Sequence, residues 1–302
     1  MSPARSFVDT VLIARFELLR ALQTWRALAL ILIYGLVCGG ATWSMIRVII
    51  VPLENTLASA LGMPSTTRPG AMLGQILGSE QYRNQLLNLF DGNEAAADLW
   101  LNTPPTVTFF VIISYVMVPF LGATTAAESI AIDRQNRALR FEAMRTGRLE
   151  FVMGRFLGQA FLMTVSVLTA GVIVGVVTVA SMTNVNIPLL VTALIDVTPW
   201  MIAATLPFLG LGIAVSQIMG SPGPARVLAL VSMFASWILL GMSERPRVAD
   251  SLIWQSVGQL LPQTWSWDLW TAPERAGPAA ILVALGVLYA AIGLPIFLRS
   301  DL

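Results

Sequence analysis

The residues of this chain best suited to bind a partner are concentrated in one stretch, residues 128–158. This stretch contains ten of the 35 charged residues, and six of these ten are arginines. Carboxylates and guanidinium groups at this density form ion pairs and charge-assisted hydrogen bonds, and no nucleophile with an adjacent base accompanies them. The sequence therefore indicates a docking surface rather than a centre for bond chemistry. The candidate docking residues are Glu128, Asp133, Arg134, Arg137, Glu142, Arg145, Arg148, Glu150 and Arg155.

The charge of this stretch predicts where it lies relative to a membrane. A charged side chain at the centre of a bilayer costs about 2.5–3.5 kcal/mol, so the stretch lies outside the lipid, and its arginine excess places it in the cytoplasm. Charged pairs at helical spacing, such as Asp133 with Arg137, are expected to stiffen it. The alternative is a solvated connector that obeys the positive-inside rule, which accounts for most blocks of this kind.

Three absences exclude whole classes of protein. All 18 basic residues are Arg, and the chain has no His. A P-loop ATPase needs a Lys to reach the phosphates, and a Ser-His-Asp triad or a His-bearing metalloprotease site needs His. The single Cys, Cys38, allows neither an intrachain disulfide nor a Cys-x-x-Cys redox site. We therefore expect no catalytic residue, no metal site and no cofactor bound by this chain.

The composition is that of a multi-pass membrane protein. The 302 residues are 56% hydrophobic and only 12% charged, with a mean hydropathy of +0.74, whereas soluble domains carry about 25% charged residues. Residues 1–26 are predicted to form an amphipathic helix that lies in the membrane interface. Its apolar side would face the lipid, and its polar side carries Glu17 and Arg20. Packing of this helix on the cytoplasmic ends of the spans is a compatible alternative. The arginines lie at predicted membrane edges rather than on one basic face, so we expect no nucleic-acid partner.

Residues 27–302 are predicted to form a transmembrane domain, which makes the chain an all-α membrane protein with six transmembrane helices. The spans are expected at about 27–50, 106–127, 156–181, 199–217, 225–242 and 278–298. The fourth span is placed at 199 because Asp196 and Pro199 interrupt a longer apolar stretch. Its segment Pro207–Gly212 forms either a hinge or a close helix contact.

Six spans put both termini on the same side of the membrane. Twelve arginines fall on the side that carries the termini and residues 128–155, and six fall on the other side. The positive-inside rule then places the N-terminus and the C-terminus in the cytoplasm. Residues 51–105 and 243–277 become the two outer loops.

A second candidate surface lies on the outer side and consists of Asp196, Trp254, Trp265 and Trp267. The tryptophans either line an outer gate or substrate path or form an aromatic belt at the membrane–water interface. Asp196 is either an intramembrane carboxylate, which is a functional candidate, or a loop residue, as the nearby Pro199 suggests.

The order of residues after the second span resembles that of the permease subunits of type-2 ABC transporters. Asp133-Arg134 looks like the acidic–Arg pair of that family, and residues 148–158 look like its re-entry into the third span. Arg155 stands where the family usually has Lys, Arg137-Ala138 replace its usual Gly-Thr, and Thr146-Gly147 replace its Pro-containing turn. The resemblance covers the whole chain in outline, including a short outer helix or re-entrant hairpin, here expected at 251–261.

The resemblance implies a type-2 ABC exporter-like permease fold with a cytoplasmic ATPase dimer docked on residues 128–155 and on the N-terminal helix. ATP and Mg would be bound by that partner, and a second permease copy or a related permease would complete the transporter. The use of Arg in place of every Lys indicates a GC-rich bacterial genome, and the Met and aromatic content suits an apolar or amphipathic cargo. We therefore expect a protein of the bacterial cytoplasmic membrane that exports such a molecule. The alternatives are a subunit that transmits force to an extracellular partner without transport and, with little support from ionisable residues within the spans, a secondary transporter.

Overall fold

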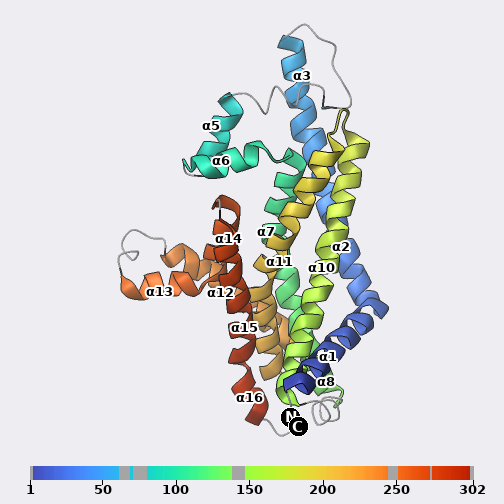
Figure 1. Ribbon diagram of the computed structural model, residues 1–302, viewed down its shortest axis with the longest axis vertical. Helices are drawn as coiled ribbons and strands as arrows, with labels where there is room; N and C mark the ends of the chain where they lie inside the picture. The colour runs from blue at the N-terminus through green and yellow to red at the C-terminus, as the bar shows by residue number, and fades with distance from the viewer. Residues whose placement is uncertain are drawn as a thin grey trace.

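The structure is a computed structural model that describes residues 3–60, 69–70, 80–90, 92–137, 147–243, 251–272 and 274–299. Every regular element within these ranges is a helix (Figure 1). The helices are α1 (Pro3–Gln23), α2 (Trp25–Met45), the π-helix η1 (Ile46–Ile50), α3 (Val51–Ala60), α5 (Glu80–Leu89), α6 (Glu94–Leu101), α7 (Pro105–Ser129), α8 (Ala131–Gln135), α10 (Arg148–Ser181), α11 (Ile187–Ile218), α12 (Pro222–Ser243), α13 (Leu252–Leu260), α14 (Pro262–Thr271), α15 (Ala276–Ile292) and α16 (Leu294–Arg299).

Six helical segments in the described part of the chain are long and apolar enough to cross a membrane, which confirms the predicted number of spans. They are Ala27–Thr56, Pro105–Gln135, Arg148–Ser181, Ile187–Ile218, Pro222–Ser243 and Ala276–Arg299. The bundle is elongated, with α1, α8 and α16 at one end and α3, α5 and α6 at the other (Figure 1). We call these the basal end and the distal end.

The two longest helices exceed the thickness of a bilayer. α10 has 34 residues and α11 has 32, which at 1.5 Å per residue gives lengths of about 51 and 48 Å, against about 30 Å for the hydrocarbon core. The prediction that the fourth span starts at 199 is wrong, because α11 begins at Ile187 and runs through Pro199 and Pro207. A proline removes one backbone donor, and neighbouring helices can compensate for that loss in a membrane bundle.

The first span also continues further than expected. α2, η1 and α3 follow one another without interruption to Ala60, so residues 51–60, placed at the start of the first outer loop, are helical. The rest of that loop contains α5 and α6, and residues 71–79 lie outside the described residues. The predicted short outer helix at 251–261 corresponds to α13, and α14 follows it directly.

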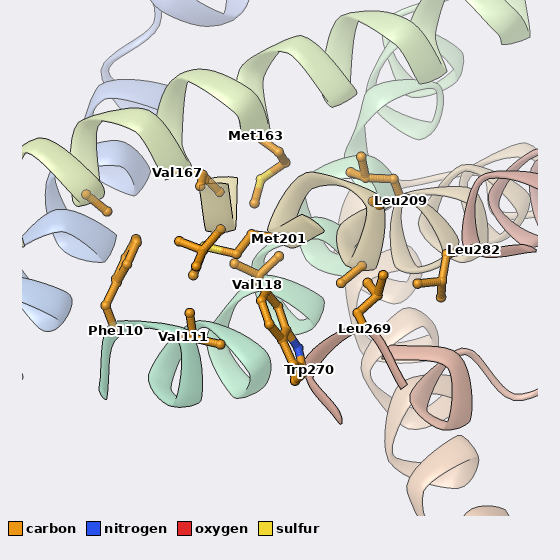
Figure 2. Packing of buried hydrophobic residues seen from close by; sticks show 14 of the residues in the cluster. Phe110, Val111, Val118, Met163, Val167, Met201, Leu209, Leu269, Trp270 and Leu282 are labelled. Atoms are coloured by element: carbon orange, nitrogen blue, oxygen red, sulfur yellow. The ribbon is translucent and has the colours of Figure 1, made fainter. Parts of the chain in front are cut away.

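The core is built around α7 and α11. Apolar side chains of these two helices meet those of α10 on one side and of α14 and α15 on the other (Figure 2). The labelled side chains in that view are Phe110, Val111, Val118, Met163, Val167, Met201, Leu209, Leu269, Trp270 and Leu282. All are 6% exposed or less, so this cluster fixes how the long helices pack against one another.

Glycines allow α11 and α15 to approach to backbone contact. A Cβ atom added at Gly210 would overlap the carbonyl oxygen of Gly286, and one added at Gly286 would lie 2.8 Å from the carbonyl oxygen of Leu206. Small residues permit this kind of close packing in membrane bundles. Of the two interpretations of the segment Pro207–Gly212, the structure favours helix packing.

Candidate functional site

The predicted docking stretch contains a buried ion cluster. The guanidinium of Arg155, in α10, donates from Nη1 to Oε2 of Glu17 in α1 and from Nη2 to Oδ2 of Asp133 in α8. Its side chain is 2% exposed, and both carboxylates are buried as well. One arginine therefore joins α1, α8 and α10.

Two further side chains complete the cluster. Arg20 donates from Nη1 to Oδ1 of Asp133 at 3.0 Å, and Gln159 donates from Nε2 to Oε1 of Glu17 at 3.0 Å. The guanidinium carbon of Arg155 also lies 5.0 Å from the ring centroid of Phe151, a cation–π distance. Two guanidinium groups thus face two carboxylates, which is the pairing that buried charges require.

The spacing of residues along α10 explains why α1 can reach the cluster. Gly154 and Gly158 lie one turn apart and flank Arg155. A Cβ atom at Gly154 would lie 2.5 Å from Cβ of Ile13, and one at Gly158 would lie 2.7 Å from Cβ of Glu17. α1 therefore packs directly on the backbone of α10, and this approach brings Glu17 within reach of Arg155 and Gln159.

Burial sets the protonation behaviour of Glu17, which lies outside the membrane-spanning segments. Removal of water from around the carboxyl raises its pKa above the usual 4.5, while the Arg155 guanidinium and the hydrogen bond from Gln159 act in the opposite direction. The pKa of this group therefore depends on Arg155 remaining in place.

α1 buries its polar side against α10 and leaves apolar side chains exposed. The exposed residues are Phe7, Val8, Val11, Leu12, Phe16 and Leu19. Ala14 and Glu17, by contrast, are buried. This arrangement agrees with both sequence interpretations, since one side of the helix packs on the bundle while the other presents apolar surface of the kind that enters a membrane interface.

Several other predicted docking residues contact their own chain. Arg134 donates to the carbonyl oxygens of Ile218 and Met219, at 3.3 and 3.4 Å. Arg148 donates to the carbonyl oxygen of Phe297 at 3.0 Å. These two arginines therefore bind the last carbonyls of α11 and the end of the chain in α16, where a cation satisfies unpaired backbone groups.

Acidic docking candidates are also engaged within the chain. Glu128, in α7, forms an ion pair with Arg226 of α12. Glu150 accepts a hydrogen bond from Oγ of Ser6 at 2.8 Å, which is a second link between α10 and α1.

The prediction that Asp133 and Arg137 form a charged pair along one helix is wrong. α8 ends at Gln135, and Arg137 lies beyond it with a positive φ of 56°, while Asp133 bonds Arg155 and Arg20 instead. Arg137 is exposed. Glu142 and Arg145 lie outside the described residues.

Four of the described residues of the docking stretch, 128–137 and 147–158, are exposed. They are Gln135 at the end of α8, Asn136 and Arg137 directly after it, and Leu149 in the first turn of α10. We call these four residues the basal contact patch. A partner can reach these four side chains because they are exposed.

Sequence reasoning missed Glu17, Arg20 and Gln159 as members of the site. Two signals pointed to them. Glu17 and Arg20 are charges on the polar side of a helix whose apolar side faces the membrane, and Gly154 and Gly158 have the four-residue spacing that lets a second helix approach.

On the outer side, Asp196 lies within α11 and not in a loop. Its Oδ2 atom accepts a hydrogen bond from Nη1 of Arg275 at 2.8 Å. Arg275 directly precedes α15, and its guanidinium carbon lies 5.9 Å from the ring centroid of Trp200. The pair connects α11 to the distal end of the last span, so the carboxylate has a structural partner.

The outer tryptophans differ from one another in their contacts. Trp267 lies 6.1 Å from Phe90 and 6.2 Å from Tyr115, measured between ring centroids, while Nε1 of Trp265 donates to the carbonyl oxygen of Gln259 at 2.7 Å. Trp254 is half-buried in α13. Trp267 thus belongs to an aromatic cluster that joins the first outer segment to α14, and the role of the three residues in a substrate path stays a prediction.

The described ranges contain no group of three or more Cys, Asp or Glu side chains that could hold a metal ion. The family described as ABC-2 family transporter protein matches residues 11–302, from the middle of α1 to the end of the chain. No curated protein matches the chain.

Proposed function

The chain belongs to the ABC-2 family of transporter proteins, and on this basis we propose that it is a permease subunit driven by a separate ATPase. The chain has no Lys, so it lacks the residue with which a P-loop reaches the phosphates of ATP. ATP and Mg would therefore be bound by a partner, with an ATPase dimer acting on this permease and on a second copy of it or a related permease. The substrate class we infer is an apolar or amphipathic molecule, which is moved outward.

The observation that carries this proposal is the position of the ion cluster beside the basal contact patch. Force applied to residues 135–137 reaches α8, and Asp133 in α8 is bound to Arg155 in α10. Arg155 in turn binds Glu17 in α1. A partner that pulls on the patch would therefore move α1 and α10 together with α8.

A second contact couples the patch to α11. The break between α7 and α8 leaves the backbone amides of Ile130 and Ala131 without helical partners, and both donate to Oγ of Ser216 at 2.9 Å. α8 is thus held by α10 and α11 at once. In the mechanism we propose, nucleotide-driven closure of the ATPase dimer displaces the patch, and the long helices α7, α10 and α11 follow as one body to alternate access for the substrate.

The patch gives a direct test of docking. Arg137→Glu combined with Leu149→Glu is expected to abolish co-purification with the ATPase and ATP-dependent export, because both side chains are exposed and the substitutions reverse a charge and add another on the docking surface. Arg134 and Arg148 are unsuitable for this test, since they bind carbonyl oxygens of α11 and α16. The measurements are affinity co-purification and transport in proteoliposomes.

The matched control for this variant is Arg83→Glu, which reverses an exposed charge at the distal end. It should leave both co-purification and transport unchanged. Normal assembly of the Arg137→Glu, Leu149→Glu protein with the ATPase would contradict docking at the patch, provided that the variant retains the wild-type melting temperature.

The proposed orientation, with the basal end in the cytoplasm, has its own test. Cys38 is buried, and the chain has no other Cys, so the background of thiol labelling is low. In intact spheroplasts a membrane-impermeant maleimide is expected to label Asn88→Cys, which is exposed at the distal end, and to label Asn136→Cys only after permeabilisation. Labelling of Asn136→Cys before permeabilisation would reverse the orientation.

A second candidate function is force transmission to an extracellular partner without transport. It is favoured by the length of α10 and α11, which exceed the hydrocarbon core of the bilayer by roughly 20 Å and, with α3, build a projection at the distal end (Figure 1). Force transmission and export can be distinguished in the reconstituted complex. A force-transmitting complex would hydrolyse ATP without moving any amphipathic probe across the membrane.

A further inference from the structure

The last membrane-spanning segment ends on the docking stretch. α15 ends at Ile292, and α16 follows Gly293 as a separate helix that lies at the basal end (Figure 1). A Cβ atom at Gly293 would lie 2.7 Å from the carbonyl oxygen of Ala214 in α11. The break between α15 and α16 therefore occurs where the last span touches the backbone of α11, and beyond it α16 contacts α8 and α10.

Phe297 is the side chain that joins α16 to these two helices. It is 0% exposed. Its ring stacks on that of Phe151 in α10, with 6.4 Å between the ring centroids and an interplanar angle of 15°. The guanidinium carbon of Arg134 in α8 lies 5.9 Å from the centroid of the Phe297 ring, which is a cation–π distance. One aromatic side chain of the last span therefore contacts α8 and α10 at once.

The backbone of α16 is held by the docking stretch as well. Nη1 of Arg148, at the start of α10, donates to the carbonyl oxygen of Phe297 at 3.0 Å and also to that of Leu298. The last carbonyls of a helix have no partner within it, so this guanidinium supplies donors to the end of α16. Arg148 directly precedes Leu149 of the basal contact patch. The contact between α16 and α10 therefore lies next to the surface on which a partner would dock.

The same contacts continue into the ion cluster. Phe151 is 1% exposed, and the guanidinium carbon of Arg155 lies 5.0 Å from its ring centroid. Arg155 in turn binds Glu17 of α1 and Asp133 of α8. Because a packed interior leaves little free space, a displacement of this cluster must also displace the ring of Phe297.

The distal end of the last span carries the outer helix α14. Only residues 272–275 separate α14 from α15, and Leu269 and Leu282 of the two helices lie in the same core cluster. Arg275, directly before α15, is paired with Asp196 of α11. A movement of α15 that starts at the basal end is therefore expected to move α14 on the outer side.

We propose that Phe297 is a positioning residue that couples the docking stretch to the last span and, through that span, to α14. This inference rests on the proposed function, because the ATPase supplies the displacement that Phe297 passes on. As the docking stretch moves, Phe151 and Arg134 move the ring packed against them, and α16, α15 and α14 follow. Phe297 itself is fully buried, so it does not contact the ATPase, and its replacement should leave docking intact.

The test measures whether nucleotide binding changes the outer end of the last span. Ala272 lies between α14 and α15 and is half-buried, so the rate at which a maleimide labels Ala272→Cys depends on how these two helices pack. Cys38, the other thiol, is buried. In the purified complex with the ATPase, ATP and vanadate trap the closed dimer, and we expect them to change this rate about fivefold, the lower end of typical coupling between two sites. Adding Phe297→Leu should abolish the change, because leucine keeps the position apolar but offers no ring face to Phe151 and Arg134.

Phe110→Leu, also added to Ala272→Cys, is the matched control. Phe110 is 0% exposed as well, and it lies at the opposite end of α7 from the docking stretch. Both substitutions replace a buried ring by a smaller side chain and should lower the melting temperature by similar amounts. Phe110→Leu should nevertheless keep the nucleotide response, and both variants should retain the ATPase on purification.

Four results would overturn the positioning role. They are the absence of a nucleotide response in Ala272→Cys alone, an undiminished response in Phe297→Leu, an equal loss of response in Phe110→Leu, and loss of the ATPase from Phe297→Leu on purification. In each case the ATPase still co-purifies with Ala272→Cys alone, so the proposed function stands. Failure of the wild-type chain to retain any ATPase would instead contradict the proposed function and, with it, the coupling through Phe297.

Discussion

Arg155→Met is expected to lower the free energy of unfolding by about 3–5 kcal/mol, the cost of breaking a buried ion pair by removing one partner. Methionine fills much of the volume of the arginine stem, so the loss arises from charge rather than from a cavity. Glu17 would keep only the hydrogen bond from Gln159, and Asp133 would keep its bond to Arg20. The measurement is thermal or denaturant unfolding of the purified protein in detergent.

The matched control is Arg137→Met, which makes the same chemical change at an exposed position and should alter stability by less than about 0.5 kcal/mol. Adding Glu17→Gln and Asp133→Asn to Arg155→Met is expected to recover part of the lost stability, because the triple variant no longer buries unpaired carboxylates. Wild-type stability in Arg155→Met would mean that the cluster does not hold the three helices together.

The same variant has a predictable pH dependence. Burial already raises the pKa of Glu17, and the Arg155 guanidinium opposes that rise, so removal of Arg155 should raise the pKa further. A carboxyl with a higher pKa in the folded than in the unfolded state stabilises the fold fully below the unfolded value of 4.5, and this contribution is lost as pH increases through the folded pKa. The deficit of Arg155→Met relative to wild type should therefore shrink as the pH is lowered towards 4.5.

The number of spans and the membrane class could be predicted from the sequence because they depend on composition and on runs of apolar residues. The residue at which the fourth span begins could not be predicted from the sequence. Asp196 and Pro199 both disfavour a helix when judged locally, yet α11 runs through them. Arg275, 79 residues further along the chain, supplies the ion-pair partner of Asp196. A partner at that sequence distance is visible only once the helices are packed.

The burial of the ion cluster also depends on contacts between residues far apart in the sequence. The sequence places Arg155 and Asp133 in a charged stretch that faces away from the lipid, and it predicts a surface. In the structure these two side chains are buried, because Gly154 and Gly158 let α1 cover them. Among the described residues of the stretch, the exposed side chains are those of the basal contact patch. The contribution of Glu17 comes from a helix that sequence reasoning assigned to the membrane interface.

The second large effect is expected at the contact of α11 with α15. Gly210→Ala should lower the free energy of unfolding by about 3 kcal/mol, at the upper end of the usual cost of overpacking. The added Cβ would meet the carbonyl oxygen of Gly286, which belongs to the backbone and cannot rotate away as a side chain would. The two helices must therefore separate, and the packing of Leu209 and Leu282 in the core is disturbed with them.

Gly241→Ala is the matched control, because Gly241 also lies in a membrane-spanning helix, and a Cβ atom there would meet nothing within 4 Å. Alanine is favoured over glycine in a helix by roughly 0.5–1 kcal/mol, so this variant should be as stable as wild type or slightly more stable. The two substitutions are chemically identical, and the difference in melting temperature between them isolates the helix contact from the change in backbone entropy. If both variants unfolded at the same temperature, α11 and α15 would not be in backbone contact, and the close packing of the last span against the centre of the bundle would have to be abandoned.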